Sequence, residues 1–295
     1  MNATERETWL AERRKGIGAS EIAAIAGLSP WAGALDIYLQ KLGVTQNRTN
    51  AAMNWGLRLE QPIADAYTEE TGIALEPSQF VQHPEHSWVL ATPDRFAADG
   101  SRLVELKCAR TADGWGDAGT DQIPDQYVCQ VHWQMLASGF GLVDVAVLIG
   151  GVDFRVYTVP RDERLVTSLF GIGQEFWRRV VEQDAPDVDW QHPEAAKLLD
   201  LLNRPNDGES VDLDETAGAL ATSYQEFGEQ IKQMEESRQH CRALLVGRMG
   251  TASLGLLPDG RRITRKDVSC AERLQKAYSY TDFRIGKPKK AKVTA

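Results

Sequence analysis

The chain has 295 residues, of which 42% are hydrophobic and 25% charged, a composition typical of globular proteins and sufficient for one large domain with an appendage. Its net charge of −9 argues against a protein that coats nucleic acid non-specifically. No apolar run approaches the roughly 18 residues of a membrane-spanning helix, and the charged N-terminus lacks the apolar stretch of a secretory signal. We therefore expect a cytoplasmic protein.

The first 185 residues alternate between helical and strand patterns. Helical spacing predicts helices at 4–14, 19–27, 34–42, 51–71, 122–139 and 162–184. Pro62, inside the fourth of these, predicts either a kink or the start of a second helix. Strand signals occur at 73–83, 88–92, 102–108, 142–151 and 154–160, and the last two flank a glycine-rich hairpin turn. The pattern predicts a compact α/β core over residues 1–185.

From residue 186 the character of the chain changes. Proline-broken connectors lead to a long polar helix predicted at 213–248, and a Pro-Asp-Gly turn then predicts a small hairpin. Residues 206–236 hold nine acidic residues and one basic residue, whereas residues 261–295 hold eleven basic and three acidic ones. We interpret 186–295 as a helical and hairpin extension with a basic, disordered tail.

The four cysteines are too far apart for a zinc or iron–sulfur motif, since no two lie within four residues of each other. We expect all of them to be buried, reduced thiols. They are Cys108, Cys129, Cys241 and Cys270.

The strand predicted at 102–108 carries charge on one of its faces. Side chains alternate across a strand, so Glu105 and Lys107 share a face with Leu103, while Val104, Leu106 and Cys108 form an apolar core face. Taken alone, the Glu–Lys pair also fits an exposed strand face. A buried charge without a partner is costly, so an inward orientation requires partners for both residues.

Asp94 changes this interpretation. It follows a short apolar run just before a turn into the Glu105 strand, and antiparallel pairing would bring the two carboxylates together. Neighbouring carboxylates persist when a cation neutralises them. Oxygen ligands without His or Cys favour Mg²⁺, with Mn²⁺ as a substitute, and the carbonyl of Leu106 lies between Glu105 and Lys107 as a further ligand. Such a centre suits phosphodiester hydrolysis.

Four sequence blocks in this order resemble the YqaJ-like viral recombinase family, whose relatives include phage lambda exonuclease. The blocks are WLAERRKGIGASEIAAIAGLSPWAGALDIYLQKLG (9–43), WGLRLEQPIADAYTEETG (55–72), ATPDR…LVELKCA (91–109) and PDQYVCQVHWQMLASG (124–139). The resemblance covers roughly residues 9–165. It implies the PD-(D/E)xK restriction-endonuclease-like fold, an α/β core with a central mixed sheet flanked by helices.

The resemblance also assigns roles to residues. It implies that Asp94 and Glu105 are metal ligands, that Lys107 is the catalytic lysine and that Glu60 helps to bind the metal. Gln130 matches a glutamine at the same centre. Gln126 and Gln134 lie one turn on either side of Gln130, and we expect these two to face solvent and Tyr127 to be a core residue.

The first block suggests a phosphate site. Three basic residues precede a Gly-x-Gly turn, and Ser20 begins the next helix, where free N–H groups favour an anion. The resemblance assigns Arg14 and Ser20 to the terminal phosphate of a DNA 5′ end. Without it, the same pattern fits a surface basic run followed by an ordinary helix cap.

The leading hypothesis is therefore a Mg²⁺-dependent exonuclease that acts on double-stranded DNA ends from 5′ to 3′ in phage-type recombination and leaves 3′ overhangs. The alternatives are an endonuclease or repair nuclease of the same superfamily, or a non-catalytic protein that binds DNA ends. The resemblance further implies a single-strand annealing protein as partner, a trimeric assembly and action in a bacterial host cell. We expect no membrane association.

Overall fold

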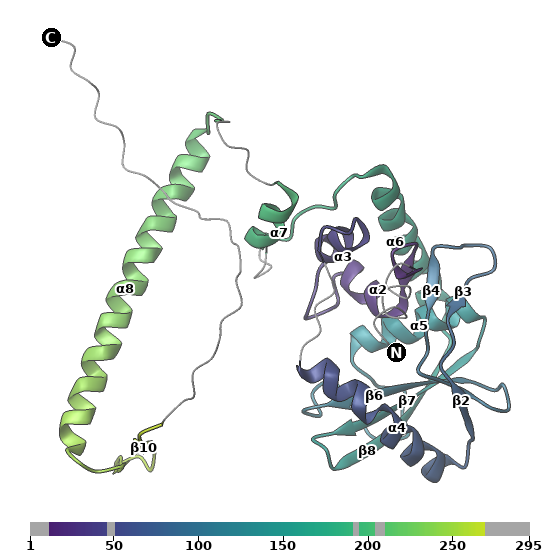
Figure 1. Ribbon diagram of the computed structural model, residues 1–295, viewed down its shortest axis with the longest axis horizontal. Coiled ribbons are helices and arrows are strands. Elements are labelled where there is room, and N and C mark those ends of the chain that lie inside the picture. The colour runs from purple at the N-terminus through teal and green to yellow at the C-terminus, as the bar shows by residue number, and fades with distance from the viewer. Residues whose placement is uncertain (1–11, 46–50, 191–194, 204–209, 269–295) are drawn as a thin grey trace. The chain divides into compact units, whose positions relative to one another are not determined.

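The computed structural model describes residues 12–45, 51–190, 195–203 and 210–268 of the chain, shown in Figure 1. The chain divides into two compact units, Met1–Arg204 and Pro205–Ala295, and each is described by itself. None of the described helices combines the length and the apolarity that a membrane crossing needs.

A five-stranded mixed sheet forms the centre of the first unit, in the order β2-β5-β6-β7-β8. The strands are β2 (Leu75–Pro77), β5 (Arg95–Ala97), β6 (Leu103–Ala109), β7 (Leu142–Ile149) and β8 (Asp153–Pro160). The β6–β7 pair is parallel and the other neighbours are antiparallel. β7 is apolar along most of its length because both of its faces are covered. The predicted central mixed sheet flanked by helices is confirmed.

A smaller sheet joins the N-terminal segment to the middle of the chain. Its order is β1-β4-β3, from β1 (Ile17–Gly18), β4 (Val89–Ala91) and β3 (Val81–Gln82), with β1 parallel to β4. The backbones approach closely here, since a Cβ atom at Gly16 would lie 2.3 Å from the Trp88 carbonyl oxygen. Glycine is therefore required at position 16.

Helices cover both faces of the five-stranded sheet. α4 (Ala51–Thr71) packs on β6 and β7 through Ile63, Ala64 and Tyr67, against Val104 and Leu106. α5 (Asp125–Ser138) covers the opposite face with Val131 and Met135. Pro62 neither starts a second helix nor ends α4, which continues through it. Pro62 lies on the exposed side of α4, where water can satisfy the carbonyl that loses its partner.

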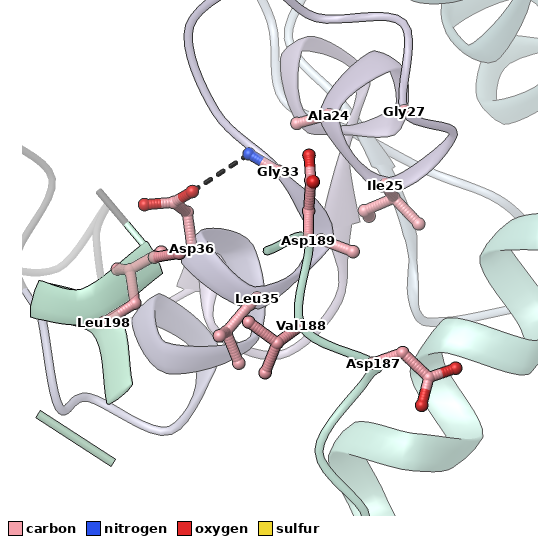
Figure 2. Close-up of a pocket in the computed structure, with 12 residues that line it drawn as sticks. Ala24, Ile25, Gly27, Gly33, Leu35, Asp36, Asp187, Val188, Asp189 and Leu198 are labelled. Atoms are coloured by element: carbon pink, nitrogen blue, oxygen red, sulfur yellow. Dashed lines mark hydrogen bonds between the residues drawn. The ribbon is translucent and has the colours of Figure 1, made fainter. Parts of the chain in front are cut away.

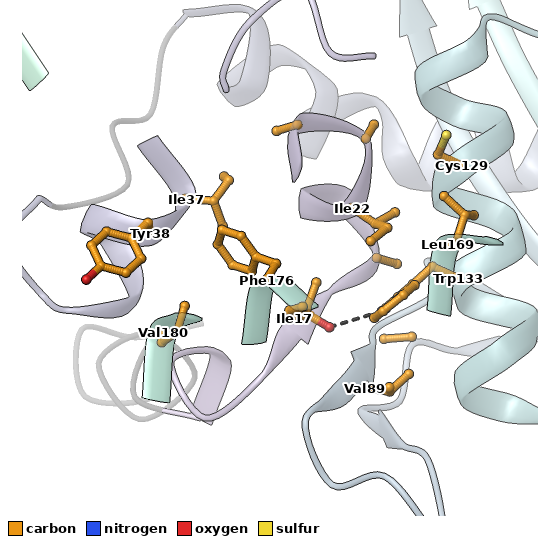
Figure 3. Close-up of a cluster of buried hydrophobic side chains, with 14 of the residues drawn as sticks. Ile17, Ile22, Ile37, Tyr38, Val89, Cys129, Trp133, Leu169, Phe176 and Val180 are labelled. Carbon is orange, nitrogen blue, oxygen red and sulfur yellow. Dashed lines mark hydrogen bonds between the residues drawn. The ribbon is translucent and has the colours of Figure 1, made fainter. Parts of the chain in front are cut away.

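The largest apolar cluster among the described residues joins α5 to four other helices of this unit. These helices are α2 (Ala19–Ile25), α3 (Ala34–Lys41), α6 (Glu163–Glu182) and α7 (Ala195–Leu202). Figure 3 shows Trp133 of α5 beside Leu169, and its indole Nε1 donates to the Ile17 carbonyl at 3.0 Å. A Cβ at Gly173 would meet the Trp133 ring at 2.4 Å, so glycine permits the close crossing of α6 over α5.

The second unit contains one long helix and a hairpin. α8 spans Glu215–Met249, and β9 (Leu254–Leu256) pairs antiparallel with β10 (Arg262–Thr264). The predicted extension is thus helical with a hairpin. α7 belongs to the compact first unit, because its Leu198 is buried in the large cluster. The boundary at residue 185, close to the end of α6, stays a prediction for where the α/β core ends.

Several local predictions differ from the structure. The strands β1 and β5 and the helix α7 were not predicted, because they are short and stabilised by tertiary contacts. Cys108 and Cys241 are exposed, so the expectation of buried thiols holds for Cys129 and is wrong for these two. Cys270, the tail and most of the helix predicted at 4–14 lie outside the described residues.

Candidate active site

The pairing of two strands brings Asp94 and Glu105 together. β5 pairs antiparallel with β6 in a register that puts Arg95 opposite Val104, so Asp94 reaches the level of Glu105. The Asp94 carboxylate accepts a hydrogen bond from the Leu106 N–H at 2.8 Å. This bond ties the start of β5 to the middle of β6 and fixes Asp94 at the edge of the site.

Glu105 is 2% exposed and faces α5. Its Oε1 accepts hydrogen bonds from Lys107 Nζ and from Gln130 Nε2, both at 2.5 Å. Its Oε2 accepts from Gln134 Nε2 at 2.6 Å. The charged strand face therefore points inward, and each carboxylate oxygen has a donor from the strand or the helix.

Negative charge exceeds positive charge at this centre. Burial, and then the neighbouring charge of Glu105, raises the pKa of Asp94 to about 8, although Lys107 and the Leu106 N–H act in the opposite direction. Glu60 of α4 has a raised pKa as well. Burial is the largest cause, and Glu105 adds to it against the charges of Arg95 and Lys107. Carboxylates from two strands and one helix thus repel one another across a small region.

Lys107 remains protonated in this surrounding. Burial alone would lower the pKa of its ammonium group, but the charges of Glu105 and Asp94 outweigh burial and raise it. The Nζ atom also lies 4.8 Å from the centroid of the Tyr127 ring and donates to Gln130 Oε1 at 3.2 Å. Lys107 is therefore suited to hold or stabilise negative charge rather than to accept a proton.

The donor set fits a hard divalent cation in its chemistry. Among the residues that the structure describes, no three His, Cys, Asp or Glu side chains already converge as a finished metal cage. At Glu105, the Oε1 atom accepts hydrogen bonds from Lys107 and Gln130. The surplus of carboxylate oxygens is nevertheless what a Mg²⁺ ion would neutralise, and Asp94 offers an oxygen that the Leu106 N–H does not use.

The structure brings most of the residues predicted for the metal centre to one place. Asp94, Glu105, Lys107 and Gln130 are linked by the contacts above, the backbone of Leu106 lies among them, and Glu60 interacts electrostatically with Glu105.

The prediction that Gln134 faces solvent is wrong. Gln134 is 0% exposed, donates to Glu105, and leaves its own Oε1 without a hydrogen-bond partner among the described residues. A signal was present, because Gln134 shares a helix face with the apolar residues Val131 and Met135.

Arg14 and Ser20 do not contact each other. The Ser20 hydroxyl accepts from Arg13 Nη2 at 3.0 Å, and the same nitrogen lies 3.1 Å from Glu21 Oε1. The exposed Arg14 lies with its guanidinium beside Gly43. Arg13 is thus the basic residue next to Ser20, which the sequence pattern did not distinguish from its neighbour.

Aromatic rings extend from Lys107 toward the surface. Tyr127, which was expected in the core, is half-buried and lies between Trp115, at a centroid distance of 5.5 Å, and Trp31, at 6.3 Å. Trp31 is 67% exposed. A row of mutually tilted aromatic rings therefore leads from the charged centre to the exposed Trp31.

One hollow in the first unit borders the carboxylates. A hollow of about 560 Å³ between α4 and β2 is lined by Gln61 and Arg95, the neighbours of Glu60 and Asp94. The pocket in Figure 2, of about 160 Å³, lies between α2, α3 and the segment 187–189 and contains none of the predicted site residues. Its Asp36 accepts from the Gly33 N–H at 2.9 Å and caps α3, so we interpret this pocket as structural.

Comparison with known proteins gives related sequences and a related fold. Residues 8–141 match the model of the YqaJ-like viral recombinase domain. The chain is 28% identical over 261 residues to the uncharacterized protein YqaJ of Bacillus subtilis (strain 168), a match that covers 85% of this chain and 81% of that protein.

Solved structures of an alkaline exonuclease from Laribacter hongkongensis, LHK-Exo, superpose on the chain. One has a TM-score of 0.51, and one in complex with dAMP has a TM-score of 0.50. Each is 24% identical to this chain and covers 60% of it and 93% of the exonuclease. The chain therefore shares the fold of this exonuclease.

Proposed function

We propose that the protein is a metal-dependent deoxyribonuclease of the YqaJ-like viral recombinase family, because residues 8–141 match the model of that domain. Its substrate in this proposal is the end of double-stranded DNA, which it degrades from 5′ to 3′ to leave 3′ single-stranded overhangs. We place this activity in phage-type recombination inside a bacterial host cell. The fold shared with an alkaline exonuclease supports the proposal.

The observation that carries the proposal is the excess of carboxylates, one buried and two half-buried, around one protonated lysine. We assign Asp94, Glu105 and Glu60, with the Leu106 carbonyl, as the residues that would hold Mg²⁺, or Mn²⁺ in its place. A divalent cation there would polarise the scissile phosphate and lower the pKa of a water molecule. The surplus negative charge supports this assignment, because a purely structural cluster would have no need of it.

The protein's own residues then supply orientation and charge. We propose that Lys107, kept protonated by Asp94 and Glu105, stabilises negative charge that develops on the phosphate. Gln130 contacts both Lys107 and Glu105, so its amide would hold these two side chains in place when the substrate binds.

Recognition of a DNA end forms the second part of the proposal. We assign Arg14 and Ser20 to the 5′ phosphate, and we include Arg13 as a candidate because it donates to Ser20. Trp31 would stack on a base near the reacting phosphate, a contact that tolerates any sequence. The family resemblance adds a single-strand annealing protein as a candidate partner and a trimer as a candidate assembly.

The test is digestion of a linear duplex labelled at the 5′ or the 3′ end, with Mg²⁺ or with EDTA. We expect early release of the 5′ label, no digestion in EDTA, and a loss of at least about 10²–10³-fold in rate for Lys107→Met and Asp94→Asn.

A duplex with a 5′ phosphate should be preferred, and the preference should be lost in Arg14→Ala or Arg13→Ala. The substitution that leaves the preference intact identifies the arginine that does not bind the phosphate.

Each alternative predicts a different result. Rapid cleavage of closed circular DNA would favour an endonuclease. Binding of duplex ends without cleavage under any metal would favour a non-catalytic end-binding protein. Full activity in Lys107→Met would refute the assignment of the site.

A further inference from the structure

The helix α8 carries a regular apolar stripe. Along α8 and its first flanking turn, apolar residues recur alternately four and three residues apart, a period of 3.5 that indicates a coiled-coil seam. The seam positions are Leu213, Ala217, Leu220, Tyr224, Phe227, Ile231 and Met234, followed at the same spacing by Arg238, Cys241, Leu245 and Arg248.

This stripe is exposed in the unit that contains it. None of the residues of α8 is buried, and Leu220, Phe227, Ile231 and Met234 are 66%, 61%, 59% and 70% exposed. With 35 residues, α8 is about 52 Å long. A helix with glycines in its interior gains most of its stability from packing of an apolar face, so this stripe is expected to have a covering partner.

The charges along α8 indicate which partner fits. The first two thirds of α8 are acidic, with one lysine, and the last third carries Arg238, Arg242 and Arg248. A second copy in antiparallel orientation places the acidic part of each helix against the basic part of the other. A second copy in parallel orientation places like charges side by side, which is unfavourable.

The seam itself favours the same orientation. In a parallel pair, Arg238 would face its own counterpart inside the apolar seam, and so would Arg248. The antiparallel register that fits the charges places Leu220 of one copy opposite Leu245 of the other. In this register Ile231 lies opposite Met234. Arg238 then lies opposite the aromatic ring of Phe227. A guanidinium against an aromatic ring is a favourable contact, whereas two guanidinium groups repel each other.

We propose that α8 is a dimerisation helix, which pairs with α8 of a second copy of this chain as a two-stranded antiparallel coiled coil centred between Ile231 and Met234. The same surface on both copies forms the contact, which closes the assembly by a two-fold axis. This proposal concerns the second unit and does not depend on the nuclease activity of the first.

The first experiment measures the mass of the full-length chain by sedimentation equilibrium or light scattering. We expect Ile231→Asp and Phe227→Asp to halve the mass, whatever assembly the first unit forms. Gln225→Asp, on the opposite side of α8, is the matched control and should leave the mass unchanged. If the wild type and both seam variants have the same mass, the proposal is overturned. This result is also expected if α8 packs on its own chain, so that arrangement would be detected as a failure of the proposal.

The second experiment tests the orientation with a short bis-maleimide cross-linker. Cys108→Ser and Cys270→Ser are first introduced to remove thiols outside the seam that could react with the cross-linker. Cys241 then remains as the exposed thiol on the seam. In the antiparallel register Cys241 faces position 224 of the other copy, so adding Tyr224→Cys should produce cross-linked dimers. Cross-linking through Cys241 alone would show a parallel pair and overturn the proposed arrangement. Positions 224 and 241 are about 25 Å apart along one helix, so the linker cannot join them within a chain.

Discussion

Two buried glutamates in the first unit each have a lysine at hydrogen-bonding distance, yet their surroundings differ in net charge. Glu21 lies 2.6 Å from Lys41 Nζ and 3.1 Å from Arg13 Nη2, so one carboxylate has two cations. Glu105 lies 2.5 Å from Lys107 Nζ but shares that lysine with Asp94 and Glu60. Both clusters are buried ion pairs, and they differ in the ratio of carboxylates to cations.

The pKa shifts follow this ratio. Burial alone would raise the pKa of Glu21, but Lys41, Arg13 and the Gly18 N–H outweigh burial and lower it. At the other cluster the balance is reversed, and the pKa of Asp94 rises to about 8. We call the Glu21 cluster balanced because its one carboxylate is fully compensated by cations, and it holds together α2, α3 and the N-terminal segment. We call the Glu105 cluster incomplete because its carboxylates outnumber its cations, and this excess of negative charge is why we propose that a cation binds there.

The largest difference between the clusters is expected in stability. Glu21→Gln leaves Lys41 buried without its counter-ion and should lower the free energy of unfolding by about 3–5 kcal/mol. Asp94→Asn, the matched carboxylate-to-amide change, resembles the protonated carboxyl that a pKa of about 8 favours at neutral pH, so it should leave stability unchanged in EDTA. All eight tryptophans lie in the first unit, so their fluorescence during urea unfolding reports on that unit. Equal destabilisation by the two changes would contradict the comparison.

Divalent metal should stabilise one cluster and not the other. Magnesium at about 100 times its dissociation constant should raise the unfolding free energy of the wild type by about 2.7 kcal/mol, because it binds the folded state. Asp94→Asn should lose this gain, whereas a milder substitution beside the balanced cluster, Ser20→Ala, should keep it. The readout is the thermal midpoint with and without Mg²⁺, which requires no DNA and no turnover. An equal Mg²⁺ response in Asp94→Asn would argue against Asp94 as a ligand.

A smaller effect is expected at Gln134, which donates to the second oxygen of Glu105. Gln134→Leu removes this donor from a buried carboxylate and should cost about 1–3 kcal/mol. Gln134→Met keeps a side chain of similar length to glutamine but also cannot donate a hydrogen bond. It should lower the free energy of unfolding as much as Gln134→Leu does, because the loss comes from the missing hydrogen bond and not from packing. No change in stability in either variant would show that Glu105 does not depend on Gln134.

The sequence predicted the incomplete cluster better than the balanced one. Asp94, Glu105 and Lys107 lie within a short stretch, and strand alternation was enough to place the last two on one face. Glu21 and Lys41 lie 20 residues apart on two separate helices, and no local pattern links them. Their contact arises from the packing of α2 on α3, which is a tertiary event. Gln134 was misjudged for a related reason, because helical periodicity alone did not show how far α5 is buried.

The smallest expected effect is a pH dependence that distinguishes the balanced cluster. The folded-state pKa of Glu21 lies below its ordinary value of 4.5, so its ionised carboxylate contributes stability that is fully present above that value. This contribution is lost as the pH falls through the folded-state pKa, where Glu21 becomes protonated. A protonated glutamic acid closely resembles glutamine in shape and charge.

The difference in unfolding free energy between the wild type and Glu21→Gln should therefore be constant from neutral pH to about pH 5 and should shrink toward pH 3. Urea unfolding at a series of pH values measures this difference, and a gap that stays constant down to pH 3 would mean that the charge of Glu21 is not what stabilises the N-terminal helices.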